Sequence, residues 1–253
     1  MPAPWDALGL TAAAYRSGTM SRREPVLLAW SSGKDSAWSL HILKTREDVE
    51  VVGLLTTVSE GFDRVAVHAV RRVLAEAQAR AADLPLTTVM LPYPCPNEVY
   101  ESALTAALVE ARRKGIRGVA FGDLFLADIR RYREGHLQGT GLSLYFPLWG
   151  RPTPVLAREM IAGGLRARLT CVDPRVLPAS FAGMEFDLQL LEALPPGVDP
   201  CGENGEFHTF AFDGPMFRHP VPVDLGEVVS RDGFVFADLL PKVELGPPPR
   251  PEP

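Results

Sequence analysis

The sequence predicts an α/β fold, in which an open, mostly parallel sheet is followed by a smaller C-terminal α+β subdomain. Short apolar runs alternate with segments of helical periodicity up to residue 121. A polar, glycine-containing turn at residues 31–36 follows the first apolar run directly, and from about residue 150 proline and glycine separate shorter elements. Strands that alternate with helices form right-handed β-α-β units, and the ligands of such parallel sheets lie at the carboxyl ends of the strands.

The first elements are the clearest. The apolar run 26–30 predicts a buried strand, and after the turn a helix is expected from about Ser36 to Lys44. The run Val51–Val58 is almost entirely apolar, as in a parallel strand that is covered on both faces. A helical stripe of apolar residues then predicts a helix over Arg64–Leu84.

The next β-α-β unit places a second polar turn at the same edge of the sheet. Residues 87–91 predict a strand, and a stripe of apolar residues predicts a helix from Asn97, as its N-cap, to Gly115. Residues 119–121 predict the following strand, and Gly122-Asp123 comes at its carboxyl end. Asp123 is therefore a candidate site residue.

Composition restricts the class of function. The chain has 253 residues and a net charge of −5, which gives no general attraction to nucleic acid or anionic membranes and favours small-molecule chemistry. Its three cysteines are far apart, which argues against a disulfide framework and favours a reducing cytoplasm. No apolar run approaches the roughly eighteen residues of a membrane span, so a cytoplasmic protein without membrane association is expected.

The turn at Ser31–Ser36 has the chemistry of a phosphate site. A sharp turn directs successive N–H groups into one concavity, and the helix that follows adds the positive end of its dipole. Gly33 allows close approach, Lys34 supplies a positive charge, and Asp35 can cap the helix or hold a cation. The spacing differs from the Walker pattern, because only one glycine immediately precedes the lysine. The alternative interpretation is an ordinary helix N-cap.

A second polar constellation spans Asp199–Phe210 and ends in a predicted strand. Its glycines permit a tight loop, and Glu203 and Glu206 can converge on an amine, a metal or a substrate. The alternative is a solvated acidic turn. Cys201 is expected to fill the turn as a small residue.

Both constellations resemble known motifs. Ser31–Ser36 is similar to the Ser-Gly-Gly-x-Asp-Ser loop of the PP-loop ATP pyrophosphatases, with Ser32 in place of a glycine. Residues 202–209, with Asp213-Gly214-Pro215, resemble the signature of the diphthine–ammonia ligase family. The resemblance covers roughly Pro25–Pro220, and it is also carried by the Arg64–Leu84 helix, the Pro92-Tyr93-Pro94 turn, Gly122–Phe125 and Pro147–Gly150.

This resemblance implies a Rossmann-like sheet of the HUP or PP-loop type and an ATP-dependent ligase. Such an enzyme adenylates a carboxylate, releases pyrophosphate and transfers ammonia, with diphthine on elongation factor 2 as the implied acceptor. ATP and Mg²⁺ are the implied cofactors. The implied domains are a PP-loop ATP-binding domain (25–149) and a substrate-binding subdomain (150–240). The residues themselves predict the two ends: weak periodicity predicts a disordered leader (1–24), and prolines predict an extended tail (241–253).

The resemblance also assigns residues to roles. The implied catalytic residues are Lys34, Asp35, Glu203, Glu206 and His208. The implied ATP-binding residues are Trp30, Ser31, Ser32, Gly33, Lys34, Asp35, Ser36, Gly122 and Asp123. The implied substrate-binding residues are Glu203, Asn204, Gly205, Glu206, His208 and Thr209. Asp35 is the implied Mg²⁺ ligand, and Lys34 is expected to hold the departing pyrophosphate.

Several alternatives stay open from the sequence. The protein can instead be a PP-loop enzyme that modifies tRNA or another small acid, or a non-catalytic module that senses adenine nucleotides. The physiological acceptor, the amine source, the lineage, a homodimeric state and the start codon, Met1 or Met20, are undecided. The arginines of segment 128–134 are expected on a solvated helix face, and the histidines outside the signature are expected to be structural or exposed. These are His41, His68, His136 and His219.

Overall fold

The computed structural model describes residues 23–65 and 69–242. The predicted leader and tail therefore lie almost wholly outside the described residues, as does His68. No helix within the described part of the chain is long and apolar enough to cross a membrane.

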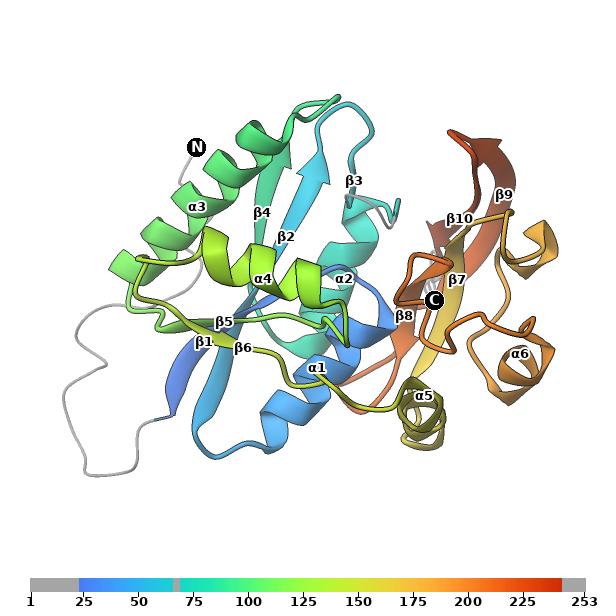
Figure 1. Cartoon of the computed structure of the whole chain (residues 1–253), viewed down its shortest axis with the longest axis horizontal. Helices are drawn as coiled ribbons and strands as arrows, with labels where there is room; N and C mark the ends of the chain where they lie inside the picture. The colour runs from blue at the N-terminus through green and yellow to red at the C-terminus, as the bar shows by residue number, and fades with distance from the viewer. Residues whose placement is uncertain (1–22, 66–68, 243–253) are drawn as a thin grey trace, which may run out of the picture.

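A parallel sheet forms the first half of the molecule (Figure 1). β1 pairs with β2 on one side and with β5 on the other, β2 pairs with β4, and β5 pairs with β6, all in parallel. A short strand, β3, runs antiparallel to the end of β2. The strands span Glu24–Ala29 (β1), Val49–Ser59 (β2), Arg64–Val65 (β3), Leu86–Leu91 (β4), Gly118–Ala120 (β5) and Ser143–Tyr145 (β6).

Helices cover both faces of this sheet. Along β1, Val26 and Leu28 pack in one apolar core with α1 and α2, whereas Leu27 packs in another with α3. All three side chains are fully buried, which explains why strands of this sheet read as continuous apolar runs. Figure 1 shows α3 and α4 on one side of the sheet and α1 and α2 on the other. The helices span Lys34–Thr45 (α1), Arg72–Ala82 (α2), Asn97–Arg113 (α3) and Ala127–His136 (α4).

The strand order places a crevice between β1 and β5. The chain leaves β1 through α1 to reach β2 on one side, and it leaves β5 through α4 to reach β6 on the other. The two connecting helices cover opposite faces, so the loops after β1 and β5 diverge at this point. In open α/β sheets, ligands bind in this crevice at the carboxyl ends of the strands.

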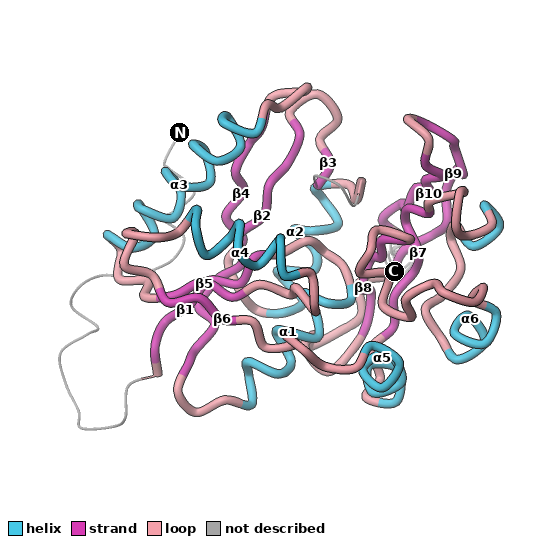
Figure 2. Tube along the Cα trace, viewed as in Figure 1, coloured by secondary structure: helices cyan, strands magenta, loops and turns pink. Residues whose placement is uncertain are grey.

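A second, antiparallel sheet with strand order β8-β7-β10-β9 follows (Figure 2). It packs against α1 and α2: Trp38 of α1 shares a core with Phe186 and Phe207, and Leu74 of α2 shares one with Phe210. The fold class predicted from the sequence is therefore confirmed. The elements of this part span Thr153–Ala162 (α5), Arg166–Val172 (β7), the 3₁₀ turn Ala179–Phe181, Leu188–Ala193 (α6), Phe207–Asp213 (β8), Val223–Arg231 (β9) and Phe234–Pro241 (β10).

Some predicted boundaries are wrong. The helix expected from Arg64 begins only at Arg72, because Arg64 and Val65 pair with β2 and the Val65 N–H donates to the carbonyl of Val70. The N-cap of α3 is Pro96 rather than Asn97, which is already the first helical residue. Strand β6 and the β9–β10 hairpin were not predicted.

Candidate functional site

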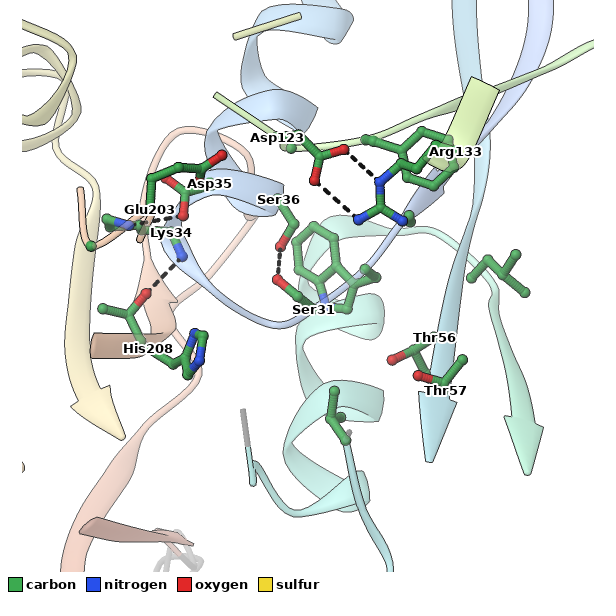
Figure 3. A pocket seen from close by; sticks show the side chains of 18 of the residues that line it. Ser31, Lys34, Asp35, Ser36, Thr56, Thr57, Asp123, Arg133, Glu203 and His208 are labelled. Atoms are coloured by element: carbon green, nitrogen blue, oxygen red, sulfur yellow. Dashed lines mark hydrogen bonds and ion pairs between the residues drawn. The ribbon is translucent and has the colours of Figure 1, made fainter. Parts of the chain in front are cut away.

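A pocket of about 380 Å³ opens at the crevice between β1 and β5. Its walls come from the ends of β1, β2 and β5, from α3 and α4, and from the loop before β8 (Figure 3). This volume is typical of small-molecule sites. The lining residues that the sequence predicted as site residues are Trp30, Ser31, Lys34, Asp35, Ser36, Gly122, Asp123, Glu203, His208 and Thr209.

The phosphate loop, Ser31–Ser36, forms the floor of the pocket. The Ser31 and Ser36 hydroxyl oxygens lie 3.2 Å apart, and the Ser36 hydroxyl also donates to the carbonyl of Gly33 at 2.9 Å. α1 begins at Lys34, so the next N–H groups belong to its first turn, where no acceptor exists within the helix. The Lys34 N–H donates to Thr209 Oγ1, so the amides of Asp35 and Ser36, together with the helix dipole, are the groups that favour an anion here.

Ser32 explains why the related loop carries a glycine here. Its φ is +72°, in the left-handed region that disfavours residues with a Cβ. Its hydroxyl is buried and has no hydrogen-bond partner among the described residues. Its carbonyl, in contrast, accepts from the Gln78 side chain of α2 and from the Ala211 N–H of β8, both at 2.9 Å. These two bonds hold the turn in its unfavourable conformation.

Gly122 allows the loop after β5 to approach α1 closely. A Cβ built on Gly122 would lie 3.1 Å from the carbonyl carbon of Asp35 and 3.1 Å from the nitrogen of Ser36. Both atoms are helix backbone, which has little freedom to move. A side chain at this position would therefore separate the two loops that form the crevice.

Lys34 is almost fully buried, with only 2% of its surface exposed. Its ammonium donates to Asp35 Oδ2 at 2.8 Å and to the carbonyl of Cys201, and it lies 5.4 Å from the centre of the Phe207 ring. Its main-chain N–H donates to Thr209 Oγ1 at 3.0 Å. Burial lowers the pKa of Lys34, but the neighbouring acidic groups, chiefly the Asp35 carboxylate, together outweigh burial and the pKa is raised. Lys34 is therefore a buried cation that joins the phosphate loop to the segment before β8.

The acid loop, Cys201–Glu206, faces the phosphate loop across the pocket. Gly202 and Gly205 have φ of +68° and +88°, which explains the glycines of this motif. Glu203 Oε1 accepts from the Leu124 N–H at 2.7 Å, so the carboxyl group is held beside the loop after β5. Burial raises the pKa of Glu203 to about 7. A carboxyl group with such a pKa exchanges protons readily at neutral pH.

Two further signature residues differ in their placement. Glu206 is 6% exposed and lies outside the pocket lining; its Oε1 accepts from the Asp199 N–H at 3.0 Å and from Asn204 Nδ2 at 2.9 Å. Its Oε2 is buried without a partner among the described residues. His208 lines the pocket, and burial together with the charge of Lys34 lowers its pKa to about 4. His208 is therefore neutral at pH 7.

Asp123 is held by an arginine that the sequence analysis placed on a solvated surface. The guanidinium of Arg133 donates to both carboxylate oxygens of Asp123, at 2.5 and 3.0 Å, and lies 4.3 Å from the centre of the Phe121 ring. Arg133 also lines the pocket. The prediction was correct for Arg131, which is exposed and pairs with Asp128, but it was wrong for Arg133.

Other lining residues were missed. Thr56 and Thr57 belong to β2, and their position at the carboxyl end of a predicted strand was a usable signal. Tyr100 and Leu104 of α3 also line the pocket, but they were assigned to an apolar helical stripe. An apolar stripe indicates the buried face of a helix without showing that part of that face borders a pocket.

A magnesium ion fits one carboxylate of this site. The described residues contain no group of three metal-binding side chains. Asp35 Oδ1 is buried and has no hydrogen-bond partner among the described residues, which leaves one carboxylate oxygen for a cation. Mg²⁺ commonly takes one or two protein carboxylates and completes its shell with water and substrate phosphates. The assignment of Mg²⁺ to Asp35 stays a prediction.

Comparison with known proteins identifies a family that this chain resembles. Residues 153–237 match the family model of the diphthamide synthase C-terminal domain. The chain is 32% identical over 151 residues to the diphthine–ammonia ligase of Mus musculus, covering 57% of this chain and 56% of the mouse protein. It is 30% identical over 151 residues to that of Homo sapiens, with the same coverage, and 35% identical over 131 residues to that of Danio rerio, covering 49% and 51%.

The aligned part spans about half the length of the curated relatives. The family model covers residues 202–209, the second of the two motifs that suggested this family. Together, the matches confirm the resemblance of the chain to the diphthine–ammonia ligases.

Proposed function

We propose that this protein is an ATP-dependent ligase that adenylates a carboxylate and transfers ammonia to the resulting acyl group. The observation that supports this most directly is the shared pocket. It places the anion-binding start of α1 opposite Glu203, a carboxyl group whose pKa is raised to about 7. One wall can hold phosphates while the other exchanges a proton with the reacting amine.

ATP would bind with its phosphates at the start of α1. The amides of Asp35 and Ser36 would donate to phosphate oxygens there, and the hydroxyls of Ser31 and Ser36 would do so by turning away from their present acceptors. The apolar walls at Leu55 and Leu104 suit the adenine ring. Asp35 Oδ1 would hold Mg²⁺, which when bound supplies positive charge that spreads over the phosphate oxygens.

In the first step, an oxygen of the acceptor carboxylate attacks the α-phosphorus of ATP. The bond between the α-phosphorus and the bridging oxygen breaks, and pyrophosphate leaves with the electron pair. The acyl-adenylate remains in the pocket. The dipole of α1 favours this step because it stabilises the negative charge that collects on the departing pyrophosphate.

In the second step, the nitrogen of ammonia attacks the acyl carbon. The bond between this carbon and the phosphate oxygen breaks, AMP leaves, and one proton of the nitrogen passes to Glu203. A base with a pKa close to the working pH is the most effective acceptor of this proton. His208 is uncharged at neutral pH and its pKa of about 4 makes it a weaker base, so we assign it to positioning the substrate.

The contacts of Lys34 favour a positioning role. Its expected contact with pyrophosphate stays a prediction, whereas its bonds to Asp35 and to the carbonyl of Cys201 are present in the structure. Through them the phosphate loop and the acid loop keep a fixed separation. We propose that this separation places the α-phosphorus within reach of Glu203.

The similarity to diphthine–ammonia ligases favours diphthine on elongation factor 2 as the acceptor and ammonia as the amine. The same assay distinguishes two other functions from this one. An enzyme that acts on tRNA would release AMP only when tRNA is present. A sensor of adenine nucleotides would bind ATP and release no product.

The test is to measure AMP and pyrophosphate released from ATP and Mg²⁺, with the acceptor acid and ammonium present. We expect AMP formation that depends on the acid, and strong loss in Glu203→Gln. Glu192→Gln, an exposed carboxyl on α6, is the matched control and should behave like the wild type. Formation of ADP in place of AMP would contradict the proposal.

A further inference from the structure

A second pocket, of about 350 Å³, lies beside the first. It is formed by the end of β2, by the turn between β4 and α3, and by the tip of the β9–β10 hairpin. Val65 of β3 lines both pockets. Val58 and Ser59, at the end of β2, pair with β4 on one side and with β3 on the other. The earlier residues of β2 pair with β1, so β3 takes the place of β1 beyond the carboxyl end of that strand. The second pocket therefore adjoins the nucleotide crevice at the same edge of the sheet.

Three aromatic rings and a guanidinium group lie close together at this pocket. The Arg231 guanidinium lies 5.1 Å from the centres of both the Phe62 and the Phe236 rings, and Tyr93 meets Phe62 edge-on at 4.7 Å. Phe62 is 43% and Tyr93 61% exposed. Exposed aromatic rings beside an arginine plane are a surface on which a flat ring can stack.

The charges around the pocket favour an anion. Arg64 and Arg71 share one carboxylate, that of Asp238, and Arg231 lies 3.6 Å from Asp232. Among the side chains that line the pocket, Arg64 and Arg231 are cationic and Asp232 is anionic, which leaves one net positive charge.

We propose that the second pocket binds the body of the acceptor as a flat ring that carries the carboxylate to be activated. The ring packs against the exposed rings of Phe62 and Tyr93 beside Arg231, and the positive charge attracts the carboxylate. The carboxylate passes Val65 to reach the α-phosphate in the first pocket. This inference rests on the proposed ligase function for its role, but the binding site itself can be tested without turnover.

The binding test uses indole-3-acetate, a flat ring with a carboxylate, and saturation-transfer NMR. We expect saturation to pass from the wild-type protein to the ring protons of the probe, with or without ATP. This transfer should be lost in the double variant Phe62→Ala/Tyr93→Ala. The matched control, Val155→Ala/Leu188→Ala, removes two exposed apolar side chains elsewhere and should bind the probe like the wild type. No saturation with the wild type, or equal saturation in the aromatic variant, would overturn the inference.

The kinetic test uses acid-dependent release of AMP. For Phe62→Ala/Tyr93→Ala, we expect the KM for the acid to rise about tenfold, because two stacking rings are lost. The KM for ATP should stay within about twofold, since the substituted residues lie outside the first pocket. An unchanged KM for the acid would contradict the inference while leaving the ligase function intact. Absence of AMP with the wild type would instead contradict the ligase function, and the probe would still test the second pocket.

Discussion

The phosphate loop and the acid loop face the same pocket, but they are built in different ways. The phosphate loop is fastened by backbone and amide hydrogen bonds, including two that reach the carbonyl of Ser32 from α2 and β8. The acid loop reverses direction at two glycines, and it carries Glu203, whose pKa is raised by burial. The comparison indicates that one loop supplies fixed dipoles while the other supplies the titrating group.

The largest expected effect comes from breaking the link between these loops. In Lys34→Met, the ammonium is lost and the Asp35 carboxylate, whose side chain is 23% exposed, is left without its partner, which we expect to cost about 2–4 kcal/mol in the free energy of unfolding. Urea denaturation measures this loss. The double variant Lys34→Met/Asp35→Asn should recover part of it, because no charge is then left unpaired. A loss below about 1 kcal/mol in the single variant, typical of a surface ion pair, would show that the link is weak.

Glu203→Gln tests the chemistry of the acid loop. If Glu203 is the base, we expect kcat to fall about 100-fold. In the wild type, kcat should rise with pH below about 7, as the carboxyl group loses its proton, and then level off. The rise should be absent in the variant. A variant that keeps the wild-type pH profile would assign the proton transfer to another group.

The same substitution, which should lower kcat, should raise the stability of the folded protein above pH 7. The pKa of Glu203 is raised on folding, so the native protein binds more protons than the unfolded chain between about pH 4.5 and 7, and stability falls as pH rises through that range. At pH 8, Glu203→Gln should therefore be more stable than the wild type by about 1–3 kcal/mol. Thermal unfolding at pH 4 and pH 8 tests this, since the gain should disappear at pH 4. A gain that is equal at both pH values would refute the linkage.

Gly122→Ala tests the fixed geometry of the phosphate loop. The new Cβ would crowd the α1 backbone at 3.1 Å, and we expect a loss of about 1–3 kcal/mol in stability together with weaker ATP binding. Gly135→Ala is the control, because a Cβ there meets open space in α4 and should stabilise the helix by about 0.5–1 kcal/mol. Calorimetry of unfolding and of ATP binding measures both quantities. Wild-type affinity for ATP in Gly122→Ala would show that the close approach is unimportant.

The smallest effect is expected for Ser32→Gly. Glycine relieves the positive φ and removes a buried hydroxyl without a partner, so stability should rise by about 1 kcal/mol. Ser39→Ala removes another buried, unpartnered hydroxyl at a helical position and separates the two causes. A gain in Ser39→Ala as large as that in Ser32→Gly would assign the effect to the hydroxyl alone.

Much of the parallel sheet and both loops could be predicted from the sequence. Strand β1 is a continuous apolar run because both faces are covered, and the glycines at positions 202 and 205 have the positive φ that a tight loop requires. The β9–β10 hairpin was also signalled, because Asp232-Gly233 is a favoured two-residue turn and both residues have positive φ. That signal was overlooked.

Other features depend on tertiary contacts that local patterns do not contain. Arg131 and Arg133 lie in the same charged segment, yet only Arg133 turns inward to pair with Asp123. The burial of Lys34 depends on β8 and on the segment before it, more than 160 residues away. The second pocket likewise combines β2, the β4–α3 turn and the β9–β10 hairpin, which are distant in the chain.

The most direct test of the proposed chemistry follows the carboxylate oxygen. The acceptor is labelled with oxygen-18 in its carboxylate and incubated with the wild-type protein, ATP, Mg²⁺ and ammonium, and the nucleotide product is analysed by mass spectrometry. Attack on the α-phosphorus predicts AMP that carries one labelled oxygen in its phosphate. Unlabelled AMP, or ADP with the label in inorganic phosphate, would contradict adenylation at this site.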